Sequence, residues 1–190
     1  MNIIKKILYI LLAIVVITIL YFYYESYSFN QYIENSNQIN NMNIPINENA
    51  PVKSRNQIEI QAPIDTVWHT LTDIKNWTKW QKAVTETTVD EKIEEGTIFN
   101  WKAGGLSFKS KIHTSKRNSA FGWTGTTIGV SAIHNWTFIK KDENTTIVIV
   151  EESLQGVFPK LFKRYFQNNL DKGVLTNLLE LKDASEMRIK

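Results

Sequence analysis

The sequence predicts an α+β fold: a curved antiparallel sheet of about seven strands around one long C-terminal helix, preceded by a single transmembrane helix. Three observations predict this architecture. An uncharged run of 18 residues stands near the N-terminus, at 7–24. Strand-like segments separated by short turns fill the middle of the chain. One broad apolar stripe with helical spacing follows over residues 157–186.

The run at 7–24, ILYILLAIVVITILYFYY, has the length of a membrane span. At about 1.5 Å per residue it covers roughly 27 Å, close to the hydrocarbon core of a bilayer. Lys5 and Lys6 precede it and Glu25 follows it, so the positive-inside rule places the N-terminus in the cytoplasm. We expect a single-pass protein of the cell membrane whose C-terminal domain lies outside the cytoplasm.

Two alternatives to an anchor exist for this run. A cleaved signal peptide has a shorter apolar core and small residues at its cleavage site, whereas bulky aromatic residues end this one. A buried core helix is the other alternative. The anchor, over 1–24, is the interpretation that we prefer.

Residues 25–53 contain eight asparagines in 29 positions and show no helical or strand period. They are therefore predicted to form a flexible tether with a reach of roughly 30 Å. The folded domain is expected to occupy 54–190. Beyond residue 24 the chain has 20 basic and 19 acidic residues, so this domain is near neutral and lacks the basic patch typical of nucleic-acid binding.

The domain is expected to begin with a strand at 55–63, because Ile58 and Ile60 alternate with polar residues. A helix follows from Pro63, and a second short helical turn carries Trp77 and Trp80. The remaining strands are predicted at 83–92, 97–103, 106–116, 119–128, 130–140 and 144–154, before the helix at 157–186. The apolar face of the sheet and the stripe of the helix are natural partners, and a curved sheet can leave a cavity between them.

Two segments carry a family resemblance. IEIQAPIDTVWHTLTDIKNWTKWQKAV resembles the opening of the START-like, or SRPBCC, superfamily, and GTTIGVSAIHNWTFIKKDENTTIVIVEESLQG resembles the late strands of its polyketide cyclase/dehydrase-like branch. The resemblance covers residues 54–186. It implies a helix-grip fold that binds lipids, sterols, polyketides or other hydrophobic molecules. Only some members of the superfamily are enzymes, and the resemblance carries no catalytic motif to this chain.

His134 is the candidate catalytic residue. It shares a strand face with Trp136 and Phe138, and Glu151 or Glu152 on the next strand must face the same side. A His–Glu pair in an apolar cavity could transfer protons. Ligand contact without chemistry and a structural, hydrogen-bonded histidine are the alternatives.

His69 and His113 are expected at the surface. The three histidines, including His134, lack metal-ligand spacing, and the chain has no cysteine. No metal site and no cofactor are therefore predicted.

Aromatic residues are expected to set the size of the cavity. Trp77 and Trp80, three residues apart, either close one end of it or stack against a ligand. The residues expected to contact a ligand are Trp77, Trp80, Phe99, Trp101, Trp123, His134, Trp136, Phe138, Phe162 and Phe166. The basic side of the last helix, with Lys160, Lys163, Arg164 and Lys172, is either an ordinary solvated face or a contact for anionic lipid headgroups.

The preferred function is a membrane-anchored START-like domain that binds a hydrophobic small molecule or lipid without catalysis. One alternative is an enzyme of the polyketide cyclase/dehydratase type that uses His134 with Glu151 or Glu152. The other is a scaffold domain whose cavity is filled by its own aromatic residues. No protein partner can be named from the residues.

Overall fold

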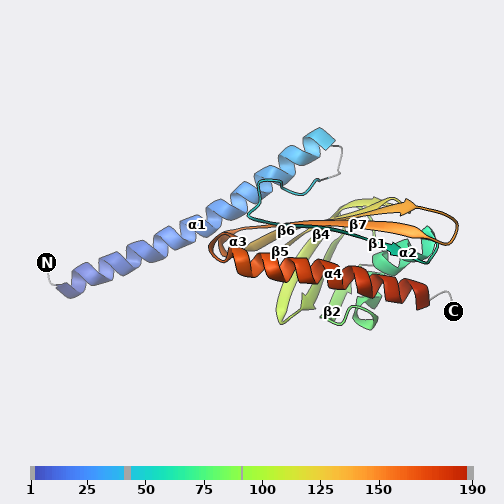
Figure 1. Cartoon of the computed structure of the whole chain (residues 1–190). Helices are drawn as coiled ribbons and strands as arrows, with labels where there is room; N and C mark the ends of the chain where they lie inside the picture. Colours follow the sequence, from blue (N-terminus) through green and yellow to red (C-terminus); the bar gives the residue numbers. More distant parts are fainter. Residues whose placement is uncertain (1–2, 41–43, 91, 188–190) are drawn as a thin grey trace.

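The computed structural model describes residues 3–40, 44–90 and 92–187 (Figure 1). Its elements are α1 (Ile3–Asn40), β1 (Val52–Ile60), α2 (Ile64–Thr72), the 3-10 helix η1 (Ile74–Lys79), β2 (Val84–Val89), β3 (Ile98–Ala103), β4 (Leu106–Lys116), β5 (Ala120–Thr127), β6 (Val130–Lys140), β7 (Thr146–Gln155), α3 (Val157–Leu161) and α4 (Lys163–Met187). The predicted α+β architecture is confirmed.

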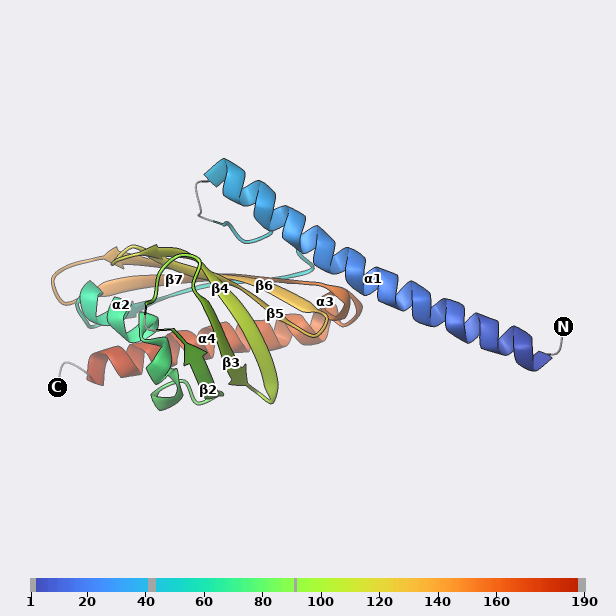
Figure 2. The ribbon, with the colours of Figure 1, turned by 180° about the vertical axis from the view of Figure 1, so that it is seen from behind.

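The seven strands form one antiparallel sheet in the order β1-β7-β6-β5-β4-β3-β2. Strands β2 to β7 are a meander in which each strand pairs with the next along the chain, and β1 adds to the outer edge of β7. Helix α4 runs along one face of the sheet, and the C-terminal part of α1 lies over the other while its N-terminal part extends away from the domain (Figures 1 and 2). The face toward α4 is called the inner face below.

The core lies between the inner face, α4 and the two short helical segments. Trp77 is 1% exposed, and its ring centroid lies 5.7 Å from that of Phe99 and 5.6 Å from that of Trp123. Its indole Nε1 donates a hydrogen bond of 2.7 Å to the carbonyl oxygen of Leu71. An indole that is buried with its N–H satisfied contributes its whole apolar area to the core. Trp77 therefore closes the η1 end of the domain.

The predicted helix at 157–186 is divided into α3 and α4. Phe162 leaves helical geometry, with φ −120° and ψ 41°, and α3 turns aside so that Phe158 packs against Gly129 of the β5–β6 turn. This division depends on a contact distant in sequence, so the apolar stripe does not reveal it. Gly173, within α4, has no atom within 4 Å of the place where a Cβ would stand, which excludes a close contact with the sheet.

Helix α1 continues well beyond the membrane-length run, to Asn40. The first part of the expected flexible tether at 25–53 is therefore helical. Phe29 on α1 is 4% exposed and packs in a cluster with Ile44, Ile46 and Ile133 on the outer face of the sheet. The Tyr32 hydroxyl donates a hydrogen bond of 3.0 Å to the carbonyl oxygen of Ile46. Burial against the domain stabilises this part of the helix, which local periodicity did not indicate.

The segment after α1 is also fixed to the sheet. The Asn47 side-chain amide donates to Gln155 Oε1 at 2.6 Å, and Asn135 donates to the carbonyl oxygen of Ile44 at 2.9 Å. Strand β1 then begins at Val52, slightly before the expected domain boundary at 54. Residues 41–43 of the expected tether lie outside the described residues.

Two glycine substitutions should change stability in opposite directions. Gly156 has φ +119°, and a Cβ there would lie 2.5 Å from the carbonyl oxygen of Gly129. Gly156→Ala should therefore lower the free energy of unfolding by about 1–3 kcal/mol. Gly173→Ala should raise it by up to about 1 kcal/mol, because the alanine meets open space in a helix interior. Urea unfolding of the full chain in non-ionic detergent, followed by circular dichroism, measures both, and the same sign for both would contradict this account.

Candidate functional site

A cavity of about 260 Å³ lies between the inner face of the sheet and α4. This volume lies just below the range for small-molecule sites, about 300–1,000 Å³. Its walls are predominantly apolar and aromatic, with a few polar groups among them. Such walls suit a small hydrophobic molecule or part of a larger one.

Small residues at the centre of the sheet create the space. Gly125 on β5 lies opposite Ala132 on β6, and Ala132 lies opposite Leu154 on β7. All three line the cavity. A Cβ at Gly125 would approach the Ser110 hydroxyl to 3.1 Å, so a larger side chain there would push into the wall.

The structure brings six of the ten expected ligand-contact residues to the cavity. These are Trp77, Trp101, Trp123, His134, Trp136 and Phe166. Phe108, which sequence reasoning missed, also lines it and stacks on Trp101 with ring centroids 4.5 Å apart. Phe108 shares a strand face with Leu106 and Ser110, because residues two apart on a strand point to the same side. That spacing was the signal that could have identified it.

The other four expected residues do not line the cavity. Phe99 is fully buried behind Trp77 and Trp123, and Phe138 packs edge-on against Trp68 at 5.4 Å. Trp80 ends η1 and borders a separate surface hollow beside Glu180 of α4. Phe162 is 56% exposed at the break between α3 and α4.

His134 and Glu152 form a pair in the cavity wall. They lie opposite each other in the register of β6 and β7, and His134 Nδ1 is 3.1 Å from Glu152 Oε2. Glu151 points to the opposite side, where its Oε1 accepts a hydrogen bond of 2.6 Å from Arg55 Nε. Of the two glutamates considered, Glu152 is thus the one beside His134.

Burial favours the uncharged form of both partners. It lowers the pKa of His134 to about 3 and raises the pKa of Glu152 to about 8. At neutral pH the carboxyl of Glu152 therefore remains protonated, and its O–H donates a hydrogen bond to His134 Nδ1. The imidazole hydrogen is then on Nε2.

Two N–H groups of the cavity wall have no hydrogen-bond partner among the described residues: His134 Nε2 and Trp136 Nε1. The two rings lie nearly parallel on the same strand face, with centroids 5.2 Å apart. A buried donor without a partner costs about 1–3 kcal/mol. Both nitrogen atoms are buried in the wall, so an oxygen atom of a ligand could satisfy either group once the ring shifts to present its N–H to the cavity.

The expected surface position of His113 is wrong. His113 is only 8% exposed, at a point where the register of β4 against β5 shifts between Ile112 and Thr114. Its ring lies on the outer face beside Gly122 and the side chain of Asn135, which binds the carbonyl oxygen of Ile44. Its Nδ1 lies 2.9 Å from the Thr114 hydroxyl. His69 is exposed on α2, as expected. Among the residues that the structure describes, no group of three His, Cys, Asp or Glu side chains could hold a metal ion.

A pH-dependent stability difference should identify the neutral carboxyl. Between about pH 4.5 and pH 8 the unfolded chain releases the Glu152 proton while the native chain retains it, so the contribution of Glu152 to the free energy of unfolding should fall as pH rises. The lowered pKa of His134 acts in the opposite direction below about pH 6.5, and comparison with a variant that keeps His134 removes this contribution. Glu152→Gln keeps a donor for His134 and cannot ionise. The variant should therefore become progressively more stable than the parent over this window, by at most about 1.4 kcal/mol per pH unit.

Parallel urea titrations at several pH values measure that difference. Glu151→Gln is the matched control, because its side chain faces Arg55 on the outer side of the sheet. A Glu152→Gln difference that stays constant or shrinks as pH rises would show that the carboxyl is ionised in the native protein over this window.

Comparisons with known proteins agree with this geometry. A hypothetical protein from Helicobacter pylori has the same fold with a TM-score of 0.66 and 18% identity, over 74% of this chain and 91% of its own. The Zhui aromatase/cyclase from Streptomyces sp. R1128 gives 0.65 and 13%, over 73% and 95%. A protein from Thermus thermophilus gives 0.63 and 17%, over 73% and 99%. At these identities the likeness shows the fold alone.

No curated protein matches the sequence. The family described as "polyketide cyclase / dehydrase and lipid transport" matches residues 51–180, which include all seven strands and most of α4. The resemblance to the polyketide cyclase/dehydrase-like branch of the SRPBCC superfamily is confirmed. The chain belongs to the polyketide cyclase/dehydrase and lipid transport family.

Proposed function

We propose that the protein is a membrane-anchored binding protein that holds a hydrophobic small molecule or lipid in the cavity between its sheet and α4. The observation that carries the proposal is the cavity itself, a space of about 260 Å³ with aromatic walls. Packed protein interiors leave few voids larger than a water molecule. A cavity of this size, in a family named partly for lipid transport, supports ligand binding over a filled scaffold.

The polar groups of the wall define the ligand further. His134 Nε2 and Trp136 Nε1 stand unpartnered in the described part of the chain, and both residues line the cavity. The ligand therefore has an apolar body with at least one acceptor oxygen, such as a carbonyl or hydroxyl. A pure hydrocarbon would leave both donors unsatisfied.

The anchoring is supported by α1. It is the one helix of the described residues that is long and apolar enough to cross a membrane, and the 18-residue window that meets this test is not buried by the rest of the protein. A run of that length exposed to water would be a large apolar surface without a partner. With Lys5 and Lys6 before it, we place the N-terminus in the cytoplasm and the binding domain outside.

A second candidate function is an enzyme of the cyclase/dehydratase type, and the His134–Glu152 pair favours it. The neutral pair could donate a hydrogen bond from Nε2 to a carbonyl oxygen of a polyketide-like substrate, or transfer the Nε2 proton to that oxygen while Nδ1 takes the proton of Glu152 and leaves a carboxylate. This candidate requires turnover that disappears in His134→Ala while the circular dichroism spectrum is unchanged. Lack of turnover by the parent protein with such substrates would exclude this second candidate function.

Filling the cavity should expel the ligand without unfolding the protein. Ala132→Leu adds three carbon atoms at the centre of the cavity, opposite Gly125. Native mass spectrometry of the full chain, purified from its source membrane, should show a bound apolar molecule for the parent and a loss of most of it for Ala132→Leu. Thr137→Leu, on the exposed side of the same strand, is the matched control and should retain the ligand. An empty parent protein would contradict the proposed function.

A further inference from the structure

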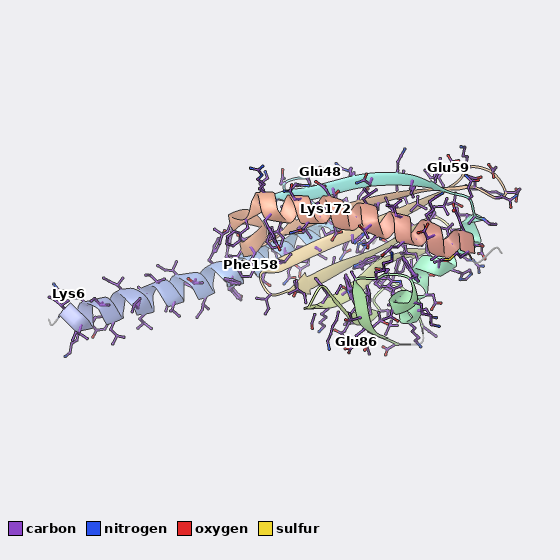
Figure 3. The ribbon with its side chains drawn as sticks, turned by 60° about the horizontal axis from the view of Figure 1, so that its bottom comes forward. Lys6, Glu48, Glu59, Glu86, Phe158 and Lys172 are labelled. Atoms are coloured by element: carbon purple, nitrogen blue, oxygen red, sulfur yellow. The ribbon has the colours of Figure 1, made fainter. Side chains whose placement is uncertain are left out.

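The membrane-length part of α1 ends against one end of the domain. Phe22 packs edge-on against Phe158 of α3, with ring centroids 5.8 Å apart, and both rings lie beside Gly129 of the β5–β6 turn. Glu25 is 6% exposed, and its Oε1 accepts a hydrogen bond of 2.5 Å from Lys160 Nζ. Figure 3 shows Phe158 at this junction and Lys6 at the far end of α1. Helix α3 therefore lies at the level where α1 would leave the bilayer.

Exposed apolar side chains surround this junction. Ile128, next to Gly129, is 82% exposed. Leu161 and Phe162, at the end of α3, are 65% and 56% exposed, and Tyr165 on the first turn of α4 is 67% exposed. We call these four residues the apolar rim. Large aliphatic and aromatic side chains at one end of a protein, beside a membrane helix, are typical of contact with the membrane interface.

The charge of the same end is positive. Between Ser153 and Leu170 the only charged residues are Lys160, Lys163 and Arg164. Lys160 binds Glu25, whereas Lys163 and Arg164 form no salt bridge with any residue that the structure describes. Basic residues beside an apolar rim match the chemistry of anionic lipid headgroups over acyl chains.

The cavity lining reaches this end of the domain. Its lining includes Thr127 and Val130, which flank the β5–β6 turn, and Phe166 and Asn169 of α4, of which Asn169 is exposed. The opposite end is closed by the buried side chain of Trp77. We call the part of the cavity lined by Thr127, Val130, Phe166 and Asn169 its mouth, and it lies beside the apolar rim.

We propose that the domain rests with its apolar rim on the bilayer that α1 crosses, so that the mouth of the cavity faces the lipid and exchanges its ligand with the membrane. The proposal rests on the proposed anchoring and, for the exchange, on the proposed ligand binding. The bilayer is the occupant of this surface because α1 places the surface beside it. The rigid contact of Phe22 and Glu25 with α3 limits how far the rim could turn away.

Site-specific quenching tests the docking. The chain has no cysteine, so one introduced cysteine carries a fluorophore at a single position. Ile128→Cys and Phe162→Cys place the label in the rim. Glu143→Cys places it on the β6–β7 turn, at the opposite end of β6, where the side chain is 86% exposed. The label is the environment-sensitive dye NBD, and the full chain is inserted in nanodiscs of phosphatidylglycerol and phosphatidylcholine that contain an acyl-chain spin-labelled lipid.

Docking predicts loss of most NBD emission at positions 128 and 162 and little loss at 143. Equal, weak quenching at all three positions would show a domain that stands free of the bilayer and would overturn the proposal. Rim labels that are shielded from water yet unquenched by the lipid would show that a protein surface covers the rim instead, which also overturns it.

The charges supply a second, independent measurement. In the Phe162→Cys background, Lys163→Gln together with Arg164→Gln should lower the ratio of docked to free domain by roughly fivefold for each charge removed. Lys172→Gln, farther along α4 (Figure 3), is the matched control and should leave quenching unchanged. Unchanged quenching in the double variant would overturn the role of anionic headgroups.

The ligand measurement separates this inference from the proposed function. If the parent binds no apolar molecule while the rim labels are quenched, the proposed ligand binding fails and the docking stands. If the ligand is present but the rim labels are not quenched, the docking fails and the proposed function stands.

Discussion

Gly129 and Gly156 allow two backbones to meet where no side chain would fit, and much of the structure depends on that approach. The Phe158 amide donates a hydrogen bond of 3.3 Å to the carbonyl oxygen of Gly129, which ties the start of α3 to the β5–β6 turn. Because α3 leads directly into α4, this contact sets where α4 begins its path across the sheet. The same contact positions Phe158 to receive Phe22 of α1. One close approach thus joins the sheet, the C-terminal helix and the N-terminal helix.

The cavity is an exception within a well-packed domain. Around it, Phe99, Phe121, Leu178 and Leu181 are almost completely buried, and their contacts hold the sheet and α4 together. Gly125 and Ala132 leave space between these layers, and His134 and Glu152 remain uncharged in its wall. Both the void and the desolvated pair reduce stability in the empty protein. A bound molecule that fills the space and accepts a hydrogen bond would offset part of that cost.

Much of the fold could be predicted because its signals are local. Alternation of apolar residues and short turns of polar residues or glycine placed every strand of the sheet to within a few residues, and the stripe of the last helix identified its partner face. Alternation also paired His134 with one of two adjacent glutamates, and only the register of β6 against β7 identified Glu152. The mistakes involve contacts distant in sequence or a break in the alternation. Phe29 meets Ile133 about a hundred residues later, and His113 lies at a bulge in β4, packed beside Gly122 on the outer face of the sheet.

The continuity of α1 through Asn40 has a mechanical consequence. A helix of 38 residues is a rod of about 57 Å, and its second half is fixed to the outer face of the sheet through Phe29 and Tyr32. Because these contacts hold α1 against the sheet, a domain anchored through α1 as proposed could not shuttle between the membrane and a distant acceptor. In the proposed membrane-anchored protein the domain would stay at the bilayer, donors and acceptors would have to come to it, and any tilt or rotation of α1 within the lipid would turn the whole domain.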